Sequence, residues 1–347
     1  MVSRKFASIN LFMIALAIWL GVDVGLAQEG FLPHGSETPG GARWVVALDG
    51  SGQFVSIQEA IDQAHSGDTI FIKAGRYVED VTVHSKEGLK VIGAGMKKVF
   101  IAGLERVGTL HIGKWPYGAT NVEISGMTIQ QHGGLGVGIF NGAGVTLRDI
   151  HVNGLIFSQQ VQRVRIENCI VGGSETTGLA FADSDAVLVG NIIHDNDHGV
   201  SVGGTSKVEL QFNVITRSLF EAVLVADNGQ ANIVQNTLVN NGGGVKFQDE
   251  GSGEIRGNII TGSKIGVAYS SQSNVARSYN AFYNNGTHEQ INGVTVSSTP
   301  GKHSTTALYV QPQFVAPNRG DFRLKTDSPL LNVGEFAHLG ALGPISQ

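Results

Sequence analysis

Three side chains of complementary chemistry recur about one repeat apart in the second half of the chain: His198, Glu221 and Lys246. If the chain winds into coils of about 22 residues, His198 and Glu221 are neighbours on adjacent strands, ~5 Å apart. A histidine beside a carboxylate is a candidate general base, and a lysine can neutralise a carboxylate while the adjacent carbon loses a proton. These are the requirements of β-elimination or C5 epimerisation at a uronic acid.

Further polar residues surround these three in the sequence and are candidate substrate-binding groups: Asp195, Asp197, Ser201, Gln248 and Asp249. Acids and histidines in Gly-rich turns are more often solvated turn formers, and that interpretation stays open beside the functional one. The acids could also bind Ca²⁺, although no known Ca²⁺-loop motif is present. We therefore assign no residue as a metal ligand and leave Ca²⁺ open as a cofactor.

The elements that must position these residues follow from an internal repeat. A polar turn residue recurs between alternating apolar stretches at separations of 19 to 23 residues. We assign the turn positions to Gly126, Asp149, Asn168, Asn191, Asn213, Asn236, Asn258 and Asn280. Stretches such as Val208-Glu-Leu210 alternate with period two, which predicts short strands with one buried face.

A repeat of three short strands cannot bury its own apolar side, but stacked repeats form one continuous core. The sequence therefore predicts an all-β, right-handed parallel β-helix, a three-sheet solenoid. Asparagine at the turn can bond to the asparagine of the next coil. One outward row of the third strand is predicted to read Gly138, Ile156, Ala180, Ser201, Leu224, Lys246 and Ala268.

The ends of a solenoid need covers, because they expose unpaired backbone and apolar core. Ser56 to Glu59 form a capping-box sequence that opens an amphipathic helix near 56–65, the predicted N-terminal cap. We assign 28–283 to the β-helix with this helix. Residues 284–347 are assigned to an irregular C-terminal cap of loops and short strands.

The first 27 residues have the features of a secretory signal: Arg4 and Lys5, an apolar run from Ile9 to Leu20, and Gly25-Leu26-Ala27 before the predicted cut. We therefore expect a secreted or periplasmic protein with no membrane span after cleavage, and a monomer. The net charge of −5 argues against a nucleic-acid partner. A single cysteine, Cys169, excludes an intramolecular disulfide.

Several segments carry a family resemblance. Val46 to Phe54, Ile57 to Asp62 and Gly67 to Tyr77 resemble the opening of pectin-lyase-like β-helix proteins, pectin methylesterases included. The middle is similar to the β-helix repeat of carbohydrate-binding and sugar-hydrolase domains, alginate epimerases and NosD-type periplasmic proteins. Pro312 to Leu324 is similar to the closing segment of secreted bacterial β-helix proteins.

The resemblance implies the fold more than the chemistry, because one scaffold hosts many activities. The catalytic motifs of pectin methylesterases and polygalacturonases are absent. We expect a protein that binds, and as a lyase or epimerase modifies, an acidic polysaccharide. The alternative is a non-catalytic carbohydrate-binding or scaffold protein of the cell envelope. A NosD-type copper role would need clustered His or Met; here the histidines are scattered, and His151 fits a partly buried structural position.

Overall fold

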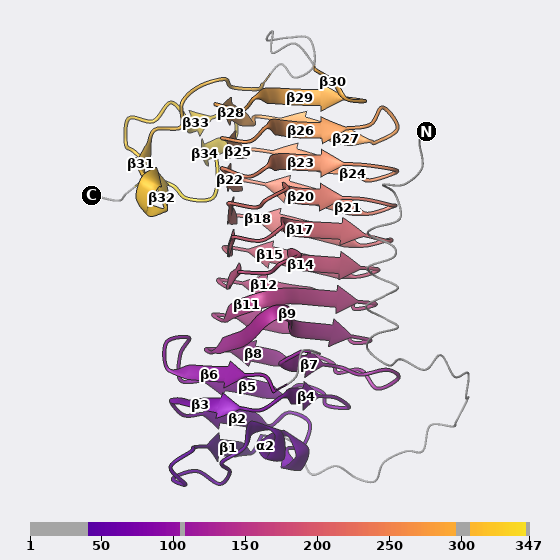
Figure 1. Cartoon of the computed structure of the whole chain (residues 1–347), viewed down its shortest axis with the longest axis vertical. Coiled ribbons are helices and arrows are strands. Elements are labelled where there is room, and N and C mark those ends of the chain that lie inside the picture. The colour runs from indigo at the N-terminus through magenta and orange to yellow at the C-terminus, as the bar shows by residue number, and fades with distance from the viewer. Residues whose placement is uncertain (1–40, 105–107, 296–305, 345–347) are drawn as a thin grey trace. The chain divides into compact units, whose positions relative to one another are not determined.

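The computed structural model describes residues 41–104, 108–295 and 306–344, which form a right-handed parallel β-helix. Figure 1 shows its coils stacked from β1 near one end to β29 near the other. Each regular coil contributes one strand to each of three faces. The predicted signal segment, residues 1–27, lies outside the described residues.

Face 1 is an eleven-stranded sheet with all neighbours parallel. Its strands are β1 (Arg43–Val46), β2 (Thr69–Ile72), β5 (Lys90–Gly93), β8 (Glu123–Ser125), β10 (Thr146–Arg148), β12 (Val164–Glu167), β15 (Asp185–Val189), β18 (Lys207–Gln211), β21 (Gln230–Val234), β24 (Ser252–Arg256) and β27 (Val275–Ser278).

Faces 2 and 3 are joined because β9 (Thr128–Phe140) and β11 (His151–Gln159) run through both. Face 2 also has β3 (Gly75–Val78), β6 (Val99–Ala102), β13 (Ile170–Gly172), β16 (Ile192–His194), β19 (Val214–Thr216), β22 (Thr237–Val239), β25 (Ile259–Thr261) and β28 (Ala281–Tyr283). Face 3 also has β4 (Val81–Val83), β7 (Leu110–Ile112), β14 (Thr177–Ala182), β17 (His198–Gly203), β20 (Glu221–Val225), β23 (Gly243–Phe247), β26 (Ile265–Tyr269), β29 (Thr287–Ile291) and the antiparallel β30 (Val294–Thr295).

Buried aliphatic side chains of successive coils stack in columns along the core. On face 1, for example, Leu188, Leu210 and Ile233 are in register and fully buried. At strand spacings of ~4.8 Å, such columns leave no gap between coils, which is how the repeat buries its apolar side. Strand alternation then leaves the intervening residues on the outside.

An asparagine ladder lines the turn between faces 1 and 2. The Asn213 amide donates to Asn236 Oδ1 at 2.9 Å and to the Leu188 carbonyl at 2.9 Å, and the same pattern repeats in neighbouring coils. The ladder consists of Asn191, Asn213, Asn236, Asn258 and Asn280, all buried.

The predicted start of this ladder was one residue out of register. Cys169, not Asn168, precedes Asn191, because the Cys169 N–H donates to Asn191 Oδ1 at 2.9 Å. Asn168 lies in the left-handed row with Gly190, at φ values of 54° and 67°. Asparagine suits both turn positions. One position needs a residue that tolerates a left-handed backbone, and the other needs a side-chain amide that forms hydrogen bonds, so residue type alone could not separate them.

The N-terminal helix α2 (Ile57–Gln63) buries Ile57, Ala60 and Ile61 at the first coils. Ser56 Oγ accepts from the Glu59 N–H at 3.3 Å, as the capping box predicts. The helix start is also capped from another element: Glu79, which follows β3, accepts from the Ile57 and Gln58 N–H groups at 2.9 and 3.0 Å. This carboxylate ties the helix to the solenoid.

The last coil replaces the apolar column with a buried ion pair. Arg277 follows Ile255 in register, and Glu289 follows Val267. Arg277 Nη1 lies 2.8 Å from Glu289 Oε2, with the side chains only 11% and 6% exposed. Because β29 still pairs in parallel with β26, the β-helix continues beyond the predicted limit at 283.

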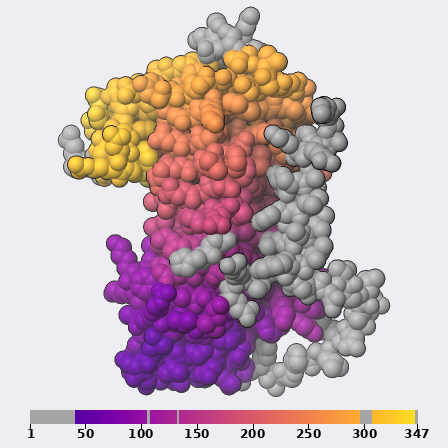
Figure 2. All heavy atoms as spheres, in the orientation of Figure 1, coloured from indigo at the N-terminus to yellow at the C-terminus, as the bar shows by residue number. Residues whose placement is uncertain are grey.

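The described part of the C-terminal tail lies against the side of the solenoid (Figures 1 and 2). It contains β31 (Phe314–Ala316), η1 (Pro317–Arg319), β32 (Asp321–Leu324), β33 (Leu331–Val333) and β34 (Phe336–His338). Buried residues of this tail, such as Leu324 and Leu339, pack on Ile259 and Ala281 of face 2. The tail therefore covers an apolar outer row of the last coils.

Candidate functional site

His198, Glu221 and Lys246 come together on the outside of face 3, at the corner where each coil turns from face 2. His198 Nδ1 lies 3.2 Å from Glu221 Oε2, and Lys246 Nζ lies 3.7 Å from Glu221 Oε1. The three side chains come from β17, β20 and β23, which are neighbours in the sheet. Coil stacking thus assembles a His–Glu–Lys cluster from residues far apart in the sequence.

Glycine at position 243 makes room for this arrangement. Gly243 is the register partner of Glu221, and a Cβ placed there would lie 3.2 Å from Glu221 Cγ. The carboxylate can therefore extend over the next strand. Lys246 lies three residues further along that strand, so its long side chain must bend back to reach Glu221.

The electrostatics of the cluster favour an ionised Glu221. Burial raises the pKa of its carboxyl, but the contact with His198 and the charge of Lys246 outweigh burial and hold the pKa below its ordinary value. His198 Nδ1 is buried and close to the carboxylate, yet it lacks an aligned hydrogen bond. The two groups therefore attract each other electrostatically, and a small rotation of the His198 ring would align a hydrogen bond between them.

An aromatic wall that sequence reasoning missed completes the cluster. The Phe220 ring stacks on the His198 ring with centroids 5.1 Å apart, and Phe220 is 49% exposed. Its neighbour Leu219 is exposed as well. The position of Phe220 directly before Glu221 in the turn was the available signal.

Two of the five predicted binding residues lie beside the cluster with partners of their own. Ser201 is on the same strand as His198, and its Oγ is 3.5 Å from Thr177 Oγ1. Asp195 accepts two bonds from Arg217, both 2.7 Å, and one from His194. The Arg217 bonds are the main reason that the Asp195 pKa falls to about 2.

Asp197 lies in the same turn and contributes its carbonyl oxygen, which accepts from the Phe220 N–H at 2.8 Å. Its side chain is partly exposed and makes no hydrogen bond or ion pair with any residue in the described ranges. Of the two turn acids, only Asp197 therefore offers a carboxylate without an arginine partner.

Gln248 and Asp249 are not part of this cluster. They follow Phe247, at the opposite end of β23 from Gly243. Five residues of strand separate Gly243 from Gln248, or about 16 Å at the usual rise. They lie beyond Lys246 along the same strand, and their substrate-binding role stays a prediction.

The outward row on face 3 also differs from the predicted one at a single coil. Phe157, not Ile156, stands between Gly138 and Ala180, and Ile156 is fully buried. Between Asn153 and Ile156 the pairing offset to β9 changes from 23 to 19 residues, because β11 has four residues fewer than β9 at this corner. The rest of the row, Ala180, Ser201, Leu224, Lys246 and Ala268, is as predicted.

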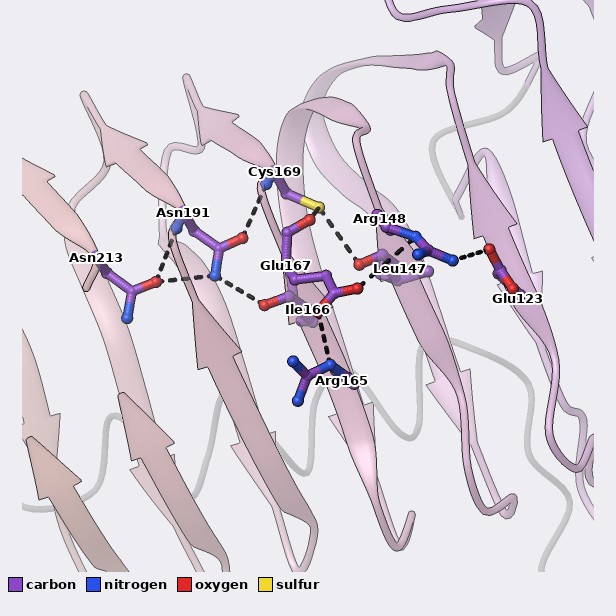
Figure 3. A network of polar contacts seen from close by, with 9 residues as sticks. All are labelled: Glu123, Leu147, Arg148, Arg165, Ile166, Glu167, Cys169, Asn191 and Asn213. Carbon is purple, nitrogen blue, oxygen red and sulfur yellow. Dashed lines mark hydrogen bonds and ion pairs between the residues drawn. The ribbon is translucent and has the colours of Figure 1, made fainter. Parts of the chain in front are cut away.

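A second polar network, on face 1, holds charges in mutual pairs (Figure 3). Arg148 contacts both Glu123 and Glu167, and Arg165 Nε lies 2.6 Å from Glu167. Because these charges neutralise one another at an exposed surface, they stabilise the fold by little and offer no free group for catalysis.

The described residues do not provide a metal centre. Within 41–104, 108–295 and 306–344, no group of three or more His, Cys, Asp or Glu side chains could hold an ion. Cys169 is buried, which raises the pKa of its thiol to about 12. His151 is half buried, which, together with nearby His194, lowers its pKa.

Residues 119–307, more than half of the chain, match the model of a family described as "Periplasmic copper-binding protein (NosD)". The chain belongs to the NosD family. Residues 43–147 of this NosD-family protein also match the pectinesterase model. With the fold above, these matches identify a pectin-lyase-like parallel β-helix. The copper in that description does not fit the described residues, because they contain no group of three or more His, Cys, Asp or Glu side chains that could hold an ion.

Solved structures resemble the NosD-family chain distantly. A pectate lyase shares 14% identity, covering 90% of this chain and 98% of its own, with a TM-score of 0.46. The carrot pectin methylesterase shares 15% identity, covering 80% of this chain and 91% of its own, with a TM-score of 0.44. The A-module of the Azotobacter vinelandii mannuronan C-5 epimerase shares 18% identity, covering 72% of this chain and 94% of its own, with a TM-score of 0.42. These likenesses are too distant to assign a function, and no curated protein matched.

The described residues include no helix that combines the length and the apolar character needed to cross a bilayer.

Proposed function

We propose that this NosD-family β-helix works in the periplasm or outside the cell, where it binds an acidic polysaccharide across face 3 and acts on it as a uronan lyase or C5 epimerase. The contact of His198, Glu221 and Lys246 at 3.2 and 3.7 Å is the observation that carries the proposal. A periplasmic location is supported by the family description.

Each of the three groups has a role in removing the C5 proton of a uronate. Glu221 faces His198 Nδ1, so the ring keeps its proton on that side and presents Nε2 as the base. Lys246 lies close enough to the same point to neutralise the uronate carboxylate as charge develops on it. The exposed Phe220 ring offers a flat surface for a sugar ring beside the base.

The proton then has two destinations. In elimination, the C5–H electrons form the C4–C5 double bond as the C4–O bond breaks, and the departing oxygen takes up a proton, which the protonated His198 can return. In epimerisation the C4–O bond stays intact, water gives a proton to C5 from the opposite side, and the protonated His198 releases its proton to solvent. Both begin with the same abstraction, so one constellation serves either outcome.

The test is a product assay on alginate and pectate. A lyase produces an unsaturated sugar whose ultraviolet absorbance rises with time, and an epimerase changes the C5 configuration seen by NMR. We expect one of these for the wild type, a large decrease in His198→Ala and a smaller decrease in Lys246→Ala. Unchanged activity in both variants would refute this site.

The second candidate is a non-catalytic carbohydrate-binding or scaffold protein. It is favoured by the small or apolar neighbours of the cluster along the outward row, such as Ala180, Leu224 and Ala268. Saturable uronan binding without any product would support this candidate over catalysis.

A further inference from the structure

A groove of about 810 Å³ runs along the outside of face 1, on a different face from the His198 cluster. It extends across the strands from β10 to β27. At ~4.8 Å per strand, these strands span about 29 Å, several times the width of one sugar ring. The shape suits an extended polymer laid along the solenoid axis.

Two rows of outward side chains line the groove. The first contains Asp185, Lys207, Gln230 and Ser252, which are successive register partners. The second contains Arg165, Val187, Glu209 and Asn232, also in register. Small and amide side chains lie toward the β27 end, and Val187 forms an apolar patch of the floor.

The groove's polar groups have few partners within the protein. Asp185 and Lys207 are directly opposite on neighbouring strands, yet they form no ion pair. The side chains of Glu209, Gln230 and Asn232 likewise make no hydrogen bond or ion pair within the described part of the chain, and all three are exposed. This differs from the paired charges of Figure 3 on the same face.

The charges that remain in the groove balance. Arg165 is paired with Glu167, which leaves Arg163 and Lys207 as cations. Asp185 and Glu209 are the acids among the lining residues. A balanced set of donors and acceptors with Gln and Asn amides suits a hydroxyl-rich neutral ligand more than a strongly charged one.

We infer that the face 1 groove binds a neutral polysaccharide chain, lying along the solenoid axis at a site separate from the His198 cluster. A peptide is a poorer occupant, because peptides add to sheets at unpaired edges. Each strand from β2 to β24 already has a neighbour on both sides, so only side chains are available here. Sugar hydroxyls need only side-chain donors and acceptors.

NMR of the full secreted chain with labelled valine methyls tests this inference, with cellohexaose, mannohexaose and xylohexaose as neutral probes. We expect at least one probe to shift the Val187 methyls saturably, and the matching disaccharide to bind more weakly. Hexagalacturonate serves as the acidic comparison.

Variants then locate the site. Lys207→Ala and Asn232→Ala should each weaken binding roughly three- to tenfold, as expected for a lost hydrogen bond. Val187→Trp should fill the floor and abolish binding. Because this variant lacks the Val187 methyls, calorimetry measures its binding. Lys90→Ala, an exposed lysine of the same face that does not line the groove, is the matched control and should bind as the wild type does.

Three results would overturn the inference: no Val187 shift with any neutral hexasaccharide, wild-type binding by Val187→Trp, or tighter groove binding of hexagalacturonate than of every neutral chain. The outcome is separable from that of the proposed function. His198→Ala should leave groove binding intact, and Val187→Trp should leave uronan turnover intact.

Discussion

The asparagine ladder at one corner of the solenoid and the His198–Glu221 pair at another differ in how far their hydrogen-bonding capacity is used. Between faces 1 and 2, each central asparagine of the ladder bonds to the asparagine of the next coil and to a backbone carbonyl. Between faces 2 and 3, His198 and Glu221 lie 3.2 Å apart without an aligned hydrogen bond. Asn241 at that corner is bonded, since it accepts from the Ser218 N–H and donates to the Ile215 carbonyl. The unsaturated group is therefore the His198–Glu221 pair and not the whole corner.

The difference identifies which repeated polar residues serve stability and which remain for a ligand. A buried amide with all its partners within the fold can do no chemistry without breaking the ladder. A histidine with one partly used nitrogen, beside an ionised carboxylate and an exposed aromatic ring, retains bonding capacity. Variants at the two corners should therefore separate stability from activity.

The largest expected effect is on activity, at His198. We expect His198→Ala to lower kcat for the uronan reaction by roughly 10²- to 10⁴-fold, the usual contribution of a general base. His194→Ala is the matched control, because His194 is in the preceding strand β16 and contacts Asp195 instead. Initial rates on alginate and pectate measure both variants. Equal losses in the two would contradict the assignment of His198 as the general base.

The next effect is on stability, at the asparagine ladder. Asn236→Ala orphans the Asn213 N–H and the Leu210 carbonyl, which the Asn236 side chain now satisfies. At about 1–3 kcal/mol for each of these two orphaned groups, the free energy of unfolding should fall by about 2–6 kcal/mol. Urea unfolding measures it, with the exposed Asn232→Ala as control. Near-equal midpoints for the two variants would show that the ladder contributes little.

A smaller effect is expected at Lys246. Replacing it by methionine removes the charge but keeps most of the side-chain length, so kcat/KM on uronans should fall about tenfold, or about 1.4 kcal/mol. Lys264→Met, an exposed lysine in the following coil, should retain the wild-type value. Retention of full activity by Lys246→Met would remove the lysine from the proposed mechanism.

The smallest effect concerns pH at Asp195. Its folded pKa of about 2 lies below the ordinary 3.8, so the bonds from Arg217 stabilise the protein above pH 3.8. That contribution disappears as the pH falls toward 2. Because the pair is about half exposed, Asp195→Asn should cost less than about 1 kcal/mol at pH 7.

Urea midpoints at pH 7 and pH 3 measure this difference, which should shrink at the lower pH. Asp197→Asn is the control from the same turn. A deficit for Asp195→Asn that grows on acidification would have the wrong sign and contradict the assignment.

Periodicity in the sequence was sufficient to predict the coil architecture and the meeting of His198 with Glu221. Both follow from counting, because equivalent positions of stacked coils become neighbours. The failures arose where the register changes. Ile156 was placed outside because β11 passes the corner with four residues fewer than β9, a difference that leaves no mark in the apolar pattern. Asn168 was aligned with Asn191 because adjacent turn positions both accept asparagine.

At the site, side-chain reach settles contacts that spacing alone does not. Lys246 is off register from Glu221 and meets it only by bending back, which no spacing rule predicts. Gln248 and Asp249 are close to Lys246 in sequence but lie beyond the far end of β23. The ion pair that ends the core, Arg277 with Glu289, was also missed, since charged residues at the end of an alternating pattern resemble surface positions.

Hydrogen exchange at C5 of the uronate tests the central claim most directly, because proton removal there precedes both elimination and epimerisation. Mannuronan and polygalacturonate would be incubated in D₂O with the wild type or with His198→Ala, and the C5 proton followed by NMR. The account predicts loss of that proton signal with the wild type and none above background with the variant. Equal loss with both proteins, or no loss with the wild type on either polymer, would contradict it.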